Sequence, residues 1–136
     1  MRISTRGRYG LRALYELALA YKQGPVSMSL ISDRQEISRK YLHALLTTLK
    51  DAGIVKAVRG AGGGYLLARK PSTITLKQIL LPLEGSLCLV HCVADRSVCK
   101  RAGRCVARGI WQDLSKGFVG VLESLTLKDL VERGLG

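Results

Sequence analysis

The stretch SRKYLHALLTTLKDAGIVKAVRGAGGGYLLA, from Ser38 to Ala68, decides the fold of this 136-residue chain. Its first half carries leucines at positions 42, 45, 46 and 49, a spacing that places them on one face of a helix. Ser38 suits the N-cap of that helix, and Gly53 suits a left-handed C-cap. The pattern therefore predicts an amphipathic helix that begins after Ser38 and ends before Gly53.

The second half of the stretch has strand composition on both sides of a glycine cluster. Residues 54–58 alternate and residues 65–68 are mostly apolar, so the pair predicts a β-hairpin. Gly60 to Gly64 would form its tip, where glycine adopts a positive φ without strain. A nucleotide-binding loop is disfavoured, because Tyr65 stands where its third glycine belongs and a strand, not a helix, follows.

Helical spacing of apolar residues continues on both sides of this stretch. A helix over residues 29–36 would precede the central helix across a short turn, so that the two helices and the hairpin form a winged helix-turn-helix. Residues 84–105 show little periodicity and are expected to form a loop. Thr126 and Asp129 predict a capping box for a short last helix. Further helices are expected over residues 5–22, 75–83 and 106–125.

The predicted fold class is mainly α: a winged helix-turn-helix domain with a β-hairpin wing and a long C-terminal helix. The length suits one domain with its own core and an appended arm. We expect three parts: the winged domain over residues 1–83, a cysteine-bearing loop over 84–105, and the long helix with the final helix over 106–136.

The charge is concentrated in one half of the chain. The formal net charge is +12, from 22 Lys and Arg against 10 Asp and Glu. Residues 1–70 hold 13 basic and 4 acidic side chains, a net +9, whereas residues 71–136 hold 9 and 6, a net +3. A basic half with a winged layout favours double-stranded DNA as the partner. A merely solvated basic surface is the alternative.

Membrane proteins, secreted proteins and enzymes are disfavoured by what the chain contains. No apolar run reaches the roughly 18 residues of a membrane span, and the N-terminal residues MRISTRGRYG lack the apolar part of a signal peptide. We therefore expect a cytoplasmic protein with no membrane partner. His43 and His91 lie on unrelated elements and no nucleophile–base pair is evident, so an enzyme is not expected.

The face of the central helix opposite its leucines is polar, and it follows the turn as a recognition helix does. Its first turn is where such a helix meets bases and phosphates. At the hairpin tip, Arg59 could enter a narrow minor groove, and glycines would let the backbone approach. A solvated helix face and a plain tight hairpin are the alternatives. The predicted DNA contacts are Arg39, Lys40, His43, Thr47, Arg59, Gly60, Gly62 and Gly63.

Four cysteines, at positions 88, 92, 99 and 105, lie within 18 residues and nowhere else. In a reducing cytoplasm such a cluster indicates metal or redox chemistry. Thiolates hold iron–sulfur clusters, and the cations around these cysteines would offset a cluster's negative charge. Zinc is the rival, because Cys88 and Cys92 form a short pair that the other two would complete to four ligands. The residues alone leave cluster, zinc and thiol sensing open.

The sequence resembles the IscR-like winged-helix regulators, a bacterial family of iron–sulfur, nitric-oxide and cysteine-metabolism repressors. The resemblance covers nearly the whole chain. It is carried by MRISTRGRYGLRAL at the start, ISDRQEISRKYL in the helix-turn-helix and VRGAGGGYLLAR in the wing. The three later cysteines and the segments IWQDL and SLTLKDL add to it.

The resemblance implies a homodimer built on the long C-terminal helix and a double-stranded DNA operator. It implies that Arg59 matches a minor-groove arginine and that Ser38 lies near the DNA. It also implies an iron–sulfur cluster on Cys92, Cys99 and Cys105, with [2Fe–2S] favoured and [4Fe–4S] as the alternative. The function would be regulation of transcription in response to Fe–S status, redox state or nitric oxide. The alternative is a cluster-free repressor of cysteine metabolism, controlled by thiol state or by a partner protein.

The chain departs from the family pattern around the cluster ligands. Six residues separate Cys92 from Cys99, where five are usual. Arg108 stands where some members have a histidine ligand, and Arg8 stands where others have an acidic ligand. The fourth ligand is therefore unassigned, with Cys88 and His91 as candidates. His43 also replaces a frequent acidic residue of the recognition helix, so operator preference is expected to differ.

Overall fold

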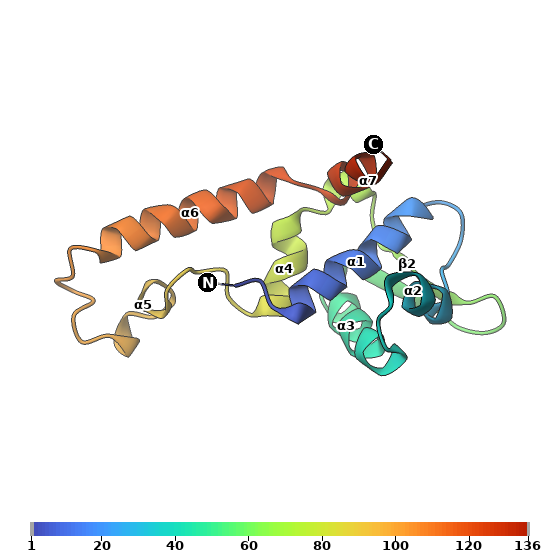
Figure 1. Ribbon diagram of the computed structural model, residues 1–136, viewed down its shortest axis with the longest axis horizontal. Coiled ribbons are helices and arrows are strands. Elements are labelled where there is room, and N and C mark those ends of the chain that lie inside the picture. Colours follow the sequence, from blue (N-terminus) through green and yellow to red (C-terminus); the bar gives the residue numbers. More distant parts are fainter. Residues whose placement is uncertain (1, 136) are drawn as a thin grey trace.

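The computed structural model describes residues 2–135 and has the predicted mainly helical fold with one two-stranded hairpin. Figure 1 shows a helical body that carries the hairpin, from which the long helix α6 extends to one side. The elements are α1 (Thr5–Leu19), α2 (Met28–Gln35), α3 (Arg39–Asp51), β1 (Val55–Val58), β2 (Gly64–Leu67), the 3-10 turn η1 (Pro71–Thr73), α4 (Leu76–Glu84), α5 (His91–Ala94), the 3-10 turn η2 (Arg96–Val98), α6 (Arg108–Ser124) and α7 (Leu127–Leu135).

Helix α3 begins and ends where its capping residues predict. The Ser38 side chain accepts a hydrogen bond from the backbone N–H of Tyr41 at 3.2 Å, which satisfies one of the first unpaired amides. At the other end Gly53 has φ +77°, and the N–H of Ile54 donates to the Leu49 carbonyl at 3.0 Å. This is a Schellman ending, which turns the chain directly into the wing.

The turn between α2 and α3 spans residues 36–38 and is one residue longer than the sequence predicts. Helix α2 ends at Gln35, and Glu36 takes a left-handed conformation with φ +54°. The backbone N–H of Ile37 then donates to the Ser32 carbonyl at 3.2 Å, and the Ile37 side chain is buried. A side chain other than glycine at such a φ costs about 1–2 kcal/mol, so this turn stores strain.

The hairpin pairs β1 with β2 in antiparallel register, from Val55 opposite Leu67 to Val58 opposite Gly64. A further antiparallel bridge joins Tyr65 to Val26, just before α2. A Cβ on Gly64 would collide with the Val26 carbonyl, so this close approach of two backbones requires glycine there. The bridge ties the wing to the segment that enters the helix-turn-helix.

The main core lies beneath α1, α3 and the wing. Its fully buried side chains include Leu14, Leu42, Leu46 and Ile79. The predicted leucine face of α3 is buried throughout, which confirms that prediction. Leu127 at the start of α7 is also fully buried in this core. The last helix therefore packs on the winged domain of its own chain.

Two predictions are wrong: the end of the first helix, and a segment without helices over residues 84–105. Helix α1 ends at Leu19, before the predicted Lys22, because the chain turns there and Lys22 itself has φ +67°. Residues 85–107, here called the cysteine segment, are not wholly loop: they contain α5 and η2. A helix of four residues is too short to leave a periodic pattern, which is why the sequence gives no sign of it.

Helix α6 leaves the body and α7 returns to it. Hydrogen bonds from the Leu76 N–H to the Leu125 carbonyl and from the Leu127 N–H to the Ile74 carbonyl fasten that return beside the start of α4. The Asp129 carboxylate accepts from the Thr126 N–H at 2.8 Å, as the predicted capping box requires. Among residues 2–135, no helix combines the length and apolar content that a bilayer span demands.

Candidate nucleic-acid interface

The predicted DNA-contacting side chains of α3 all lie on its exposed side. The Thr47 hydroxyl donates to the His43 carbonyl at 2.8 Å, so it can offer only its acceptor lone pairs to a ligand. Ser38 is exposed as well, although its oxygen already caps the helix. The exposed side chains of Arg39, Lys40, His43 and Thr47 are here called the recognition face.

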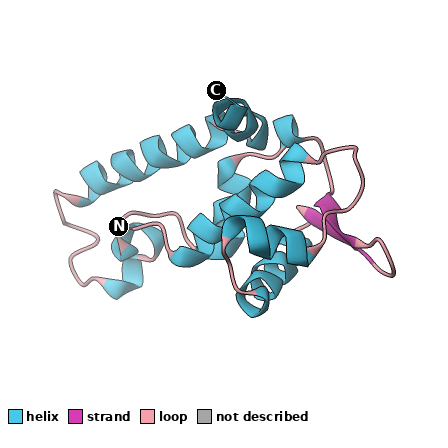
Figure 2. Cartoon of the chain, turned by 45° about the vertical axis from the view of Figure 1, so that its right-hand side comes forward, coloured by secondary structure: helices cyan, strands magenta, loops and turns pink. Residues whose placement is uncertain are grey.

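The wing tip has the form that its glycines predict. Gly60 has φ +95° and Gly62 has φ +74°, and the Gly63 N–H donates to the Gly60 carbonyl at 3.0 Å. A Cβ on Gly63 would collide with the Val58 carbonyl. Arg59 is exposed at the base of this tip. Figure 2 shows the hairpin loop projecting clear of the helices, so a duplex groove could receive it.

A polar network behind the helix-turn-helix was not predicted from the sequence. Glu16 of α1 is only 6% exposed. Its carboxylate accepts from the Gln35 amide at 2.8 Å and pairs with Arg34 at 3.3 Å. The Arg12 guanidinium donates to the Gln35 side chain at 3.1 Å and also bonds the Gln35 carbonyl. These contacts hold α2 against α1, and they join residues 18 to 23 positions apart, which no local pattern reveals.

The cysteine segment lies at the opposite end of the molecule from the wing (Figure 1). All four thiols are reduced and partly exposed. The Arg108 guanidinium donates to the Cys92 carbonyl at 3.2 Å, which ties α5 to the start of α6. The Ser97 hydroxyl, and then its N–H, hold the pKa of the Asp95 carboxyl below its ordinary value. The surrounding cations Arg96, Lys100, Arg101 and Arg104 are exposed.

The predicted cluster ligands are not gathered into a site. Within residues 2–135, no three side chains of His, Cys, Asp or Glu come together as metal ligands would. The donor set itself fits an iron–sulfur cluster, because three accessible thiols on one segment can supply most of its ligands. The segment would have to rearrange to bring Cys92, Cys99 and Cys105 together, so their assignment stays a prediction.

The two candidates for a fourth ligand lie in different surroundings. Cys88 faces α6 and lines a hollow of about 360 Å³ together with Gln112 and Ser115. Ser115 is buried, and its hydroxyl accepts from the Leu89 N–H at 3.1 Å, which fixes the start of the segment on α6. His91 is exposed at the first position of α5. These positions do not show which of the two residues would be the fourth ligand.

Helix α6 leaves an apolar face uncovered. Ile110 is 59% exposed, Leu114 is 51% exposed and Val121 is 56% exposed, and Trp111 adds to the same helix. The buried residues of α6 are only Ser115 and Leu122. So much exposed apolar surface on one helix is typical of a protein–protein contact.

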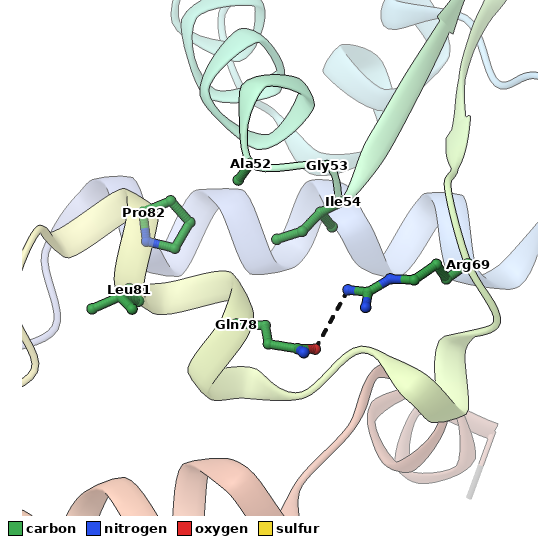
Figure 3. A pocket seen from close by; sticks show the side chains of 7 residues that line it. All are labelled: Ala52, Gly53, Ile54, Arg69, Gln78, Leu81 and Pro82. Carbon is green, nitrogen blue, oxygen red and sulfur yellow. Dashed lines mark hydrogen bonds between the residues drawn. The ribbon is translucent and has the colours of Figure 1, made fainter.

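A groove of about 660 Å³ lies where α3, the wing and α4 meet, and Figure 3 shows its lining. Arg69 at the end of the wing reaches across it to the Gln78 side chain, at 3.5 Å. The other lining residues are Ala52, Gly53, Ile54, Leu81 and Pro82. This lining holds no nucleophile and no general acid or base, so it offers no hydrolytic or acid–base chemistry.

Comparison with known proteins gives one consistent family. Residues 3–133 match the model of the Rrf2 family, described as iron-dependent transcriptional regulators. The HTH-type transcriptional regulator IscR of Photorhabdus laumondii is 38% identical over 131 residues, which cover 96% of this chain and 79% of that protein. The structure of T. potens IscR is 38% identical with a TM-score of 0.80, covering 98% and 88% of the two chains. The structure of CymR, the global cysteine regulator of B. subtilis, is 38% identical with a TM-score of 0.82, covering 98% of each chain.

Proposed function

The chain belongs to the Rrf2 family of transcriptional regulators, and we propose that it acts as a homodimer that binds an operator in double-stranded DNA. In this proposal the recognition face of α3 enters the major groove and the wing tip enters the adjacent minor groove. The apolar face of α6 joins the two copies. Its relatives are regulators and not enzymes, and this chain is a regulator of the same kind.

The proposed DNA contact is supported by two exposed, basic features that lie on adjacent elements. One is the recognition face at the start of α3, and the other is the glycine tip with Arg59. The Schellman ending of α3 leads straight into β1, so the two features are rigidly connected. Both lie in the half of the chain with net charge +9, which favours a polyanion.

The test is operator binding at several salt concentrations, with an operator selected from random DNA. Affinity should fall steeply between about 50 and 200 mM salt, because neutralised phosphates release their counterions.

Arg59→Ala should cost about 1–3 kcal/mol of binding free energy, the scale of one groove contact. His43→Ala should relax base preference at one position instead. Lys128→Ala, which removes a cation from α7, is the control; equal losses for it and Arg59→Ala would refute the wing assignment.

For the regulatory signal we propose that Cys92, Cys99 and Cys105 hold an iron–sulfur cluster, [2Fe–2S] in the first instance. The cluster would supply a group that is sensitive to iron supply, oxidants and nitric oxide. The protein would contribute three thiolates, and the exposed cations around them would offset the cluster's negative charge. The fourth ligand would be Cys88 or His91.

Anaerobic reconstitution followed by absorption spectroscopy and iron and sulfide analysis tests the ligand set. Each of Cys92→Ala, Cys99→Ala and Cys105→Ala should abolish the visible absorbance. Cys88→Ala separates the two candidates for the fourth ligand: a retained chromophore would exclude Cys88, and a lost chromophore would support it. Retained colour in any of the three variants would overturn the assignment, and four zinc-bound thiols in a colourless protein would replace it with a zinc site.

A second candidate function is a cluster-free repressor controlled by the thiols themselves or by a partner protein. The likeness to the cysteine regulator CymR, which matches this chain as closely as IscR does, favours it. A protein that stays colourless and free of iron and zinc after reconstitution, yet binds DNA according to its thiol state, would establish this alternative.

A further inference from the structure

One contact crosses the helix-turn-helix on its exposed side. The guanidinium of Arg39 donates from Nη2 to the hydroxyl oxygen of Ser29 at 2.7 Å. Arg39 is the first residue of α3, and Ser29 is the second residue of α2. Both are outside the core, so this hydrogen bond adds little to the packing of the two helices.

The contact sets Arg39 apart from Lys40 and His43 of the recognition face. Within residues 2–135, the side chains of Lys40 and His43 make no hydrogen bond or ion pair, so they point freely into solvent. Arg39, one residue earlier, is instead held toward the start of α2. In helix-turn-helix proteins that first helix crosses the DNA backbone, whereas the second helix reaches the base edges.

We propose that Ser29 is a positioning residue that holds Arg39 against the DNA phosphate backbone and leaves base recognition to Lys40 and His43. This inference rests on the proposed DNA contact of α3. Of the bases and phosphates that the first turn of a recognition helix can meet, it assigns Arg39 to the phosphates, where the side chain sets the register of the protein on the duplex.

The chemistry of the guanidinium supports this division. It has five N–H donors in a planar fork, so one bond to Ser29 leaves enough donors for a two-pronged contact with a phosphate. A side chain that is fixed before binding loses less conformational entropy when the complex forms. Ser29 would therefore raise affinity without touching any base.

Three variants, measured on the selected operator over a salt series, test the proposal. Arg39→Gln should weaken binding by a similar factor on the operator and on single-base variants of it. It should also reduce the salt slope by about 1.8, which is about 0.9 for each of the two subunits. Ser29→Ala should weaken binding by about 2- to 10-fold and leave the salt slope unchanged, because no charge is removed. Ser29→Thr keeps the hydroxyl and should restore the affinity of the parent chain.

The double variant Ser29→Ala/Arg39→Gln decides whether Ser29 acts through Arg39. It should bind no more weakly than Arg39→Gln alone; losses that multiply would overturn the proposal. A change of base preference in Arg39→Gln would overturn it as well, because Arg39 would then read a base. A parent chain that binds no DNA would refute the proposed function itself, which is a different result. Thermal unfolding of each variant confirms that affinities are compared between folded proteins.

Discussion

The winged domain and the arm formed by the cysteine segment and α6 are stabilised in different ways. The winged domain buries a continuous core, with Leu14, Leu42, Leu46 and Ile79 fully inaccessible. The arm contributes the buried Leu87 and Leu122 and the partly buried Phe118 and Val119 to a smaller second cluster, which forms on Leu80 of α4. Its helix instead exposes a row of large apolar side chains. One region is complete within a single chain, whereas the other lacks the contacts that would bury its apolar face.

The winged domain can present a DNA-binding surface from a single chain, whereas the arm has an apolar face that a single chain leaves uncovered. DNA contact requires a rigid surface, and the core beneath α3 supplies one. The arm has partly exposed thiols at one end and an uncovered helix along its length, and in the proposed function a second chain and a group held by the thiols complete it. Four predictions, from the largest expected effect to the smallest, test how far the two regions differ.

The largest effect should come from the core of the winged domain. Leu46→Ala removes a fully buried side chain, and such a change costs about 2–5 kcal/mol of unfolding free energy because a cavity remains. Urea unfolding followed by circular dichroism measures it. Leu114→Ala on α6, where the leucine is 51% exposed, is the matched control. If the two variants lose equal stability at low protein concentration, the arm is as well packed as the core.

The next effect should appear in assembly rather than in folding. Leu114→Glu places a charge in the middle of the uncovered face of α6 and should make the protein monomeric at micromolar concentration, because an unpaired buried charge is costly. Sedimentation velocity measures the change, while circular dichroism should show the winged domain still folded. A variant that remains dimeric would move the dimer contact away from this face.

A smaller, stabilising effect is expected at the turn before α3. Glu36→Gly removes the strain of a left-handed residue with φ +54°, and should stabilise the winged domain by about 0.5–1 kcal/mol after the greater freedom of unfolded glycine is subtracted. Asp33→Gly, in the middle of α2, is the control and should instead destabilise slightly, by about 0.3 kcal/mol, because Asp is already a poor helix former. Thermal or urea unfolding of both variants gives the comparison, and destabilisation by both would show that the turn is unstrained.

The smallest effect should be a pH dependence at the return of the arm. The Thr126 N–H, and then its hydroxyl, hold the pKa of Asp129 below the ordinary 3.8. The carboxylate therefore stabilises the folded state above that value, and this contribution is lost as the pH falls through the lowered pKa. The parent chain should unfold with a larger free energy than Asp129→Asn at pH 6, and this difference in free energy of unfolding should become smaller as the pH is lowered to 3. A difference that stays constant over this range would mean that the charge of Asp129 contributes nothing.

The sequence predicts the parts of this molecule whose causes are local. The leucine spacing of α3, its caps at Ser38 and Gly53, the glycine tip and the capping box at Thr126 each depend on a few neighbouring residues, and the structure confirms them. The family resemblance, confirmed by the comparisons, added the kind of function.

Features that depend on distant residues could not be predicted in this way. The buried Glu16 meets Gln35 from another helix, and the Tyr65 backbone bridges to Val26 across the fold. The contact between Ser29 and Arg39 spans a turn whose shape depends on Glu36. None of these leaves a periodic signal, because each arises only after the helices have packed. The cysteine ligands are harder still, since the arrangement that would hold a cluster is not the one observed.

The return of the chain at residues 125–127 has a mechanical consequence. Helix α6 has 17 residues, so it is a stiff rod about 25 Å long. One end is clamped to the winged domain by the backbone bonds at Leu125 and Leu127, and the other end carries the thiols. A stiff helix that is fastened at one end pivots about that end when its other end moves. A shift of about 4 Å at the end that carries the thiols would correspond to a tilt of the helix axis of about 10° over that length, so a small displacement there would change the orientation of α6 relative to the winged domain.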